Sequence, residues 1–107
     1  MLARSTFGGA LILLSSTLVQ AADPTAGLKA ARSLCVNCHV VEPGALSPAE
    51  MTAGIPSFKV IAEKGGQTQD KLKVFMLSPH PPMPQVQLTT HELDNLASYI
   101  MSLKGQK

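Results

Sequence analysis

The chain has 107 residues, of which 45% are hydrophobic, and it carries nine basic and seven acidic side chains for a formal net charge of +2. Such a small charge does not support nucleic-acid binding through a basic surface, so we expect no nucleic-acid partner. The length fits one small domain, and domains of this size usually need a disulfide, a metal or a cofactor to stabilise their limited core.

The first 21 residues have the pattern of a secretory signal peptide. Arg4 supplies a short positive start, and the largely apolar stretch 7–19 runs into the sequence VQA, which resembles a cleavage site. Three hydroxyl residues interrupt this stretch, whereas a transmembrane helix needs about 20 consecutive apolar residues. We therefore expect cleavage of residues 1–21, leaving one domain over 22–107 in the bacterial periplasm with no stable membrane insertion. An uncleaved membrane anchor is the alternative.

The remaining chain is predicted to be all-α. Asp23 followed by proline indicates the start of a helix that runs toward Cys35. The segment 40–56 is rich in proline and glycine and is predicted to be a loop. Pro56 could open a second helix with the sequence PSFKVIAEK, and a third helix is expected over residues 69–78.

Two further features complete the predicted helical pattern. The sequence PHPPMPQ follows the third helix and can form neither a helix nor a central strand, because proline lacks the backbone donor. Thr89 and Glu92 have the spacing of a capping box, which predicts a last helix that ends near Gly105. Apolar residues recur along one stripe of this helix, and no segment alternates convincingly enough for a strand.

Both cysteines of the chain, Cys35 and Cys38, lie in the sequence CVNCH, directly before His39. A structural disulfide between them would close a tiny loop and leave the histidine unexplained. A redox-active thiol pair of the thioredoxin type expects a preceding strand and βαβ patterning, which are not seen. A zinc site needs further ligands, and the histidines that remain are His80 and His91, without a second cysteine pair.

Covalent haem attachment accounts for all three residues of this motif. C-x-x-C-H is the c-type haem signature, in which the two thiols add to the vinyl groups and the imidazole reaches the iron from one side. The spacing at a helix end lets the three side chains face one porphyrin plane. We therefore expect one haem c per chain, bound covalently through Cys35 and Cys38, with His39 as an iron ligand.

The chain from about Asp23 to Lys104 resembles a class I c-type cytochrome of the small bacterial kind. The resemblance is carried, in order, by Gly27 eight residues before Cys35, by CVNCH, and by the sequences GIPSF, PHPPMP and LASYIMSL. It implies an all-α fold of about four helices wrapped around one covalently bound haem.

The second axial ligand is expected to be Met83. Prolines stiffen the surrounding PPMPQ sequence, so a thioether held there loses little entropy on binding iron. The resemblance also places the axial methionine in this loop. Met76 and Met101 lie in amphipathic helices and are expected to fill the core, while Met51 lies too close to the attachment motif. His80 is the second candidate for the ligand.

The resemblance implies roles for three further residues. A ligating histidine normally donates its other ring N–H to a carbonyl or a carboxylate, and the carbonyl of Pro56 in GIPSF is the matching acceptor for His39. Gly27 and Tyr99 are expected to meet where the first and last helices cross.

Histidine–methionine ligation would leave no open position on the iron, which indicates electron transfer rather than enzyme catalysis. The expected partners are redox proteins, namely a dehydrogenase, a reductase or an oxidase. An open-site haem enzyme or gas sensor is the alternative if Met83 does not bind, and a haem-free zinc module is a third hypothesis. Lysines at 59, 64, 71 and 73 either steer an acidic partner or form a solvated helix face.

Overall fold

The computed structural model describes residues 2, 9, 12–16, 20–45, 54–78 and 80–107. Within these residues it contains four helices and no strand, which confirms the predicted all-α class. The helices are α1 (Pro24–Leu34), α2 (Phe58–Glu63), α3 (Gln69–Leu77) and α4 (Thr90–Ser102). Arg4 and Met51 lie outside the described residues.

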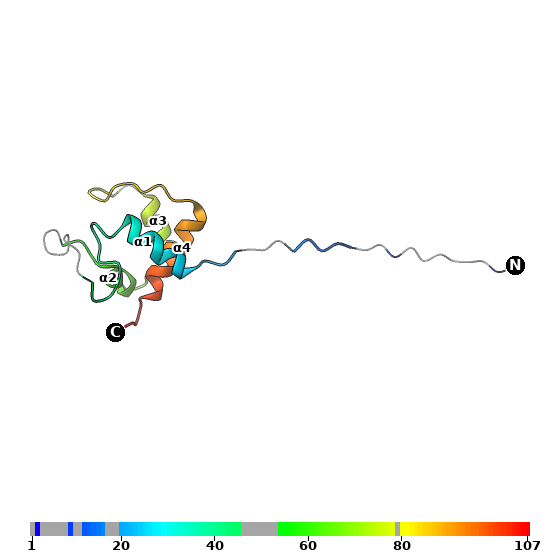
Figure 1. Ribbon diagram of the computed structural model, residues 1–107, viewed down its shortest axis with the longest axis horizontal. Coiled ribbons are helices and arrows are strands. Elements are labelled where there is room, and N and C mark those ends of the chain that lie inside the picture. The colour runs from blue at the N-terminus through cyan, green and yellow to red at the C-terminus, as the bar shows by residue number, and fades with distance from the viewer. Residues whose placement is uncertain (1, 3–8, 10–11, 17–19, 46–53, 79) are drawn as a thin grey trace.

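The last helix is the centre of the fold. Each of the other three helices packs against α4, and α1 crosses it most extensively (Figure 1). Met76 and Met101 are partly buried against the shared core, as predicted for methionines in amphipathic helices. The buried core cluster consists of Ala31, Cys35, Val41, Phe58, Ala62, Leu72, Leu96, Ala97, Tyr99, Ile100 and Leu103.

Side-chain caps define where the helices begin. The carboxylate of Asp23 accepts a hydrogen bond from the Thr25 N–H at 2.8 Å, and proline follows in the first turn of α1. At α4 the predicted capping box is present in both directions: the Glu92 N–H donates to Oγ1 of Thr89 at 3.2 Å, and the Thr89 N–H donates to the Glu92 carboxylate at 2.8 Å. These local bonds satisfy backbone donors that no helical carbonyl can reach.

The second helix begins later than the sequence predicted. Ser57 is its N-cap, because its hydroxyl accepts a hydrogen bond from the Val60 N–H at 3.2 Å, and the helix starts at Phe58. The Phe58 N–H donates to the Val40 carbonyl at 2.9 Å. Pro56 therefore lies outside α2, and its carbonyl oxygen accepts no hydrogen bond within that helix.

Helices α1 and α4 approach closely at Gly27. A Cβ atom built on this glycine would overlap the Asn95 carbonyl oxygen and would lie 2.7 Å from Cβ of Tyr99. Only glycine allows this separation, so the predicted meeting of Gly27 and Tyr99 at the helix crossing is confirmed. Nearby, the Asp23 N–H donates to Oδ1 of Asn95 at 2.7 Å, which fixes the start of α1 on α4.

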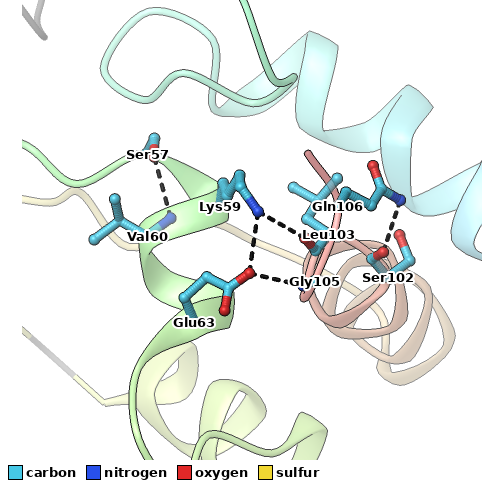
Figure 2. Close-up of polar contacts among 8 residues, drawn as sticks. All are labelled: Ser57, Lys59, Val60, Glu63, Ser102, Leu103, Gly105 and Gln106. Atoms are coloured by element: carbon cyan, nitrogen blue, oxygen red, sulfur yellow. Dashed lines mark hydrogen bonds and ion pairs between the residues drawn. The ribbon is translucent and has the colours of Figure 1, made fainter.

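A cluster of polar contacts joins α2 to the end of the chain (Figure 2). The Glu63 carboxylate accepts a hydrogen bond from the Gly105 N–H at 2.7 Å and contacts Nζ of Lys59 at 3.0 Å. These two donors, the backbone N–H first, hold the pKa of Glu63 below its ordinary value. The contacts secure the segment that follows α4.

Residues 12–16, which the structure describes, lie away from the helical body (Figure 1). The side chains of Ile12, Leu13 and Leu14 are more than 80% exposed. Among the described helices, none combines the length and the apolar character that a membrane crossing requires.

Candidate functional site

The CVNCH motif forms a single helical turn at the end of α1. The Cys35 N–H still donates to the Ala31 carbonyl at 2.9 Å, so the motif continues directly from the helix. The N–H groups of Cys38 and His39 then both donate to the Cys35 carbonyl, at 3.1 and 2.9 Å. Side chains three and four residues apart on such a turn lie on the same side, so the two thiols and the imidazole can address one planar group.

The two cysteines differ in their surroundings. Both are free thiols; Cys35 belongs to the buried core cluster, whereas Cys38 is exposed. Burial penalises the thiolate, and the neighbouring Cys38 sulfur adds to this effect, so the pKa of the Cys35 thiol is raised to about 11. At neutral pH the buried thiol is therefore protonated.

The ring of His39 is buried and held in one orientation. Its Nδ1 lies 2.7 Å from the carbonyl oxygen of Pro56. Because a carbonyl only accepts, Nδ1 carries the proton, and the lone pair of the neutral ring is on Nε2. The Phe58 ring lies beside the imidazole, with ring centroids 5.3 Å apart, and supports it from α2.

Met83 lies half-buried in a turn after α3. The Met83 N–H donates to the His80 carbonyl at 3.3 Å, which closes the turn. Nε2 of His80 lies 3.0 Å from the Met83 sulfur, a contact that sequence reasoning did not foresee. The three-residue spacing within a proline-rich turn was the signal that could have indicated it. His91, by contrast, is exposed at the start of α4.

These residues fit a haem c group by the chemistry of their donor atoms. Two thiols on one turn can form thioether bonds, and an imidazole whose proton is fixed on Nδ1 presents Nε2 to a metal. A thioether in a stiff loop is a ligand that iron accepts opposite histidine. Among the described residues no group of three or more histidine, cysteine, aspartate or glutamate side chains could hold a metal ion.

Comparison with curated proteins gives a clear relative. The chain is 39% identical over 90 residues to cytochrome c-552 of Bradyrhizobium diazoefficiens, and the aligned region covers 84% of each chain. The chain belongs to the small c-type cytochromes. No protein-family model matches the chain. No solved structure matches it.

Membership in the c-type cytochromes confirms several expectations from the sequence. The cofactor is covalently bound haem c with its iron, and the protein is an electron carrier rather than an enzyme. Its partners are redox proteins. The four helices of the structure agree with the small all-α fold that the resemblance implied.

Proposed function

We propose that this cytochrome is a periplasmic carrier that passes one electron at a time, with His39 and Met83 as the two axial ligands of its haem iron. The observation that carries the proposal is the contact between Nδ1 of His39 and the Pro56 carbonyl at 2.7 Å. This contact fixes both the tautomer and the direction of the imidazole. It is the arrangement that a metal-ligating histidine requires.

The chain's own residues then have distinct tasks. Cys35 and Cys38 would hold the cofactor covalently, which keeps it on a small domain whose core alone is limited. Bound haem supplies the one-electron redox centre. The thioether of Met83 favours the reduced iron and raises the reduction potential relative to a second nitrogen ligand. With both axial positions filled by the protein, small molecules are kept from the metal and electron transfer is the remaining activity.

The start of the folded domain supports cleavage after residue 21. Asp23 caps α1 and donates its N–H to Asn95, so the contacts that anchor α1 begin two residues after the proposed cleavage position. Removal of residues 1–21 would leave these contacts intact. The intact mass of the purified native protein tests this proposal, and a mass that includes residues 1–21 would refute it.

Two of the lysines that could attract an acidic partner form ion pairs within the chain instead. Nζ of Lys73 pairs with Asp94 at 2.8 Å and with Asp70 at 3.2 Å, and Lys59 pairs with Glu63. Each ion pair offsets a positive charge that would otherwise attract an acidic partner. For Lys59 and Lys73 we therefore favour a solvated, internally paired helix face over a role in steering a dehydrogenase, reductase or oxidase.

The ligand assignment is tested by the reactivity of the iron. Wild-type reduced protein should bind carbon monoxide poorly, because both axial positions are filled. Met83→Ala should lower the reduction potential and change the ferric absorption spectrum, whereas Met76→Ala should mainly reduce stability, because Met76 packs against the core. Rapid and complete carbon monoxide binding by the wild type would support an open-site enzyme or gas sensor instead.

A further inference from the structure

The turn that carries Met83 also places an imidazole nitrogen at the methionine sulfur. Nε2 of His80 is 3.0 Å from Sδ of Met83, and the turn between them is closed by the backbone bond from the Met83 N–H to the His80 carbonyl. Both side chains are partly buried. The short turn therefore fixes two potential metal ligands next to each other.

The position of the proton on the His80 ring determines the chemical nature of the contact between His80 and Met83. Nδ1 lies 2.7 Å from the Ser78 carbonyl oxygen, which can only accept, so Nδ1 carries the proton. In the neutral ring the lone pair is then on Nε2 and is directed at Met83. A thioether sulfur has no proton to donate. The contact therefore brings together two electron-pair donors, which is an arrangement that suits a shared electron-pair acceptor such as a metal.

The ring of His80 is held in this orientation by a second contact. Its centroid lies 3.9 Å from that of Phe75, with an angle of 33° between the ring planes. Phe75 belongs to α3, whose end immediately precedes the turn, so the ring is held between a helix and the Ser78 carbonyl. A side chain that is already ordered loses little further conformational entropy when it binds a ligand or a metal.

We propose that His80 is a reserve ligand of the haem iron, which binds through Nε2 when the Met83 thioether is removed or displaced. The inference rests on the proposed function, because it takes Met83 as the ligand of the undisturbed protein. The exchange breaks an iron–sulfur bond and forms an iron–nitrogen bond. No electron is transferred, and no proton moves because Nδ1 keeps its hydrogen. Its consequence is that the iron stays closed to small molecules when the thioether is lost.

The experiment compares three variants of the holoprotein at pH 8. They are Met83→Ala, the double variant Met83→Ala/His80→Gln, and the matched control Met83→Ala/His91→Gln. The ferric spin state and carbon monoxide binding by the reduced protein are measured. Met83→Ala and the control should both be low-spin, with a spectrum that differs from the wild type, and should bind carbon monoxide poorly. The double variant at His80 should lose the low-spin spectrum and bind carbon monoxide readily.

A further measurement covers the case in which the double variant does not fold. Met83→Ala protein labelled with ¹⁵N-histidine should show hyperfine coupling of the ferric iron to two imidazoles, independently of protein concentration. Coupling to one imidazole, or a concentration dependence that assigns the second imidazole to another molecule, would overturn the proposal. For a folded double variant, added imidazole should restore the low-spin spectrum.

The outcomes separate this inference from the proposed function. A Met83→Ala variant that is high-spin and binds carbon monoxide as rapidly as the double variant would overturn the role of His80, while the altered spectrum would still support Met83 as the native ligand. A Met83→Ala spectrum identical to that of the wild type would refute Met83 ligation and, with it, the reserve role.

Discussion

The hydroxyl of Tyr99 donates a hydrogen bond to the carbonyl oxygen of Val41 at 2.5 Å, and both residues are buried. The bond joins α4 to the chain two residues beyond His39. The Tyr99 ring also lies beside Phe58, with centroids 6.4 Å apart, and Phe58 in turn lies beside the imidazole. Burial is the main reason that the pKa of Tyr99 is raised, so the hydroxyl remains a donor at all ordinary pH values. One side chain thus supports the segment that carries the proposed iron ligand.

Replacing Tyr99 with phenylalanine should lower the free energy of unfolding by about 1–2 kcal/mol, because it removes the donor to a buried carbonyl while keeping the ring. Denaturant unfolding of the holoprotein measures the change. Covalent haem should remain at the wild-type level, since the cysteines are untouched. Unchanged stability would show that the Tyr99–Val41 bond makes no net contribution.

Gly27→Ala should destabilise the domain by about 3 kcal/mol or more, because the new methyl group meets the Asn95 backbone, which cannot move as a side chain would. The built Cβ lies 2.6 Å from the Asn95 carbonyl carbon and 2.7 Å from Cβ of Tyr99. The gain in helix propensity from glycine to alanine is only about 1 kcal/mol and does not offset this overlap.

A matched glycine provides the control for this prediction. A Cβ on Gly65 has no atom within 4 Å, so Gly65→Ala should change stability by no more than about 1 kcal/mol. Thermal unfolding of both variants gives the comparison. Equal effects of the two substitutions would contradict the close approach of α1 and α4.

Apart from what the family resemblance implied, the parts of the structure that the sequence predicted are those with local signals. The caps of α1 and α4 depend on residues no more than three positions apart, and both were predicted correctly. The start of α2 was predicted two residues early, at Pro56 instead of Phe58, because serine and proline both signal a helix start. The family resemblance supplied Pro56 as the acceptor for His39, which spacing alone could not.

Other contacts depend on how distant segments pack, and the sequence has no local signal for them. The bond from Gly105 to Glu63 joins residues 42 positions apart, and that from Tyr99 to Val41 joins residues 58 positions apart. The contact of His80 with the Met83 sulfur is local, yet it depends on the path of a proline-rich turn that no periodicity describes.

Glu63→Gln should weaken the attachment of the chain end to α2, and the loss should depend on pH. The folded-state pKa of Glu63 lies below its ordinary value of 4.5, chiefly through the hydrogen bond from Gly105 and then through Lys59. A lowered carboxyl pKa adds stability above about 4.5, and that contribution disappears as the pH falls through the folded-state value. The wild type should therefore be more stable than the variant at pH 7, with the difference shrinking in acid.

Removal of residues 105–107 is the control for the Glu63 prediction, because it deletes the backbone donor. In that background Glu63→Gln should cost less than in the full chain, as a double-mutant cycle of unfolding free energies would show. A cost that is the same in both backgrounds would assign the effect to Lys59 alone and not to the chain end.

Cys35→Ala and Cys38→Ala should each reduce covalent haem, because each removes one thioether position, and the double variant should hold none. Only the buried Cys35 sulfur also packs in the core, so Cys35→Ala should destabilise the domain more than Cys38→Ala does. Acid denaturation followed by mass measurement determines how much haem stays on the polypeptide, and denaturant unfolding compares the stabilities.

Haem that extracts freely from the wild type would contradict attachment through CVNCH. Equal stability of the two single variants would contradict a packing role for the Cys35 sulfur, and would leave attachment as its whole contribution.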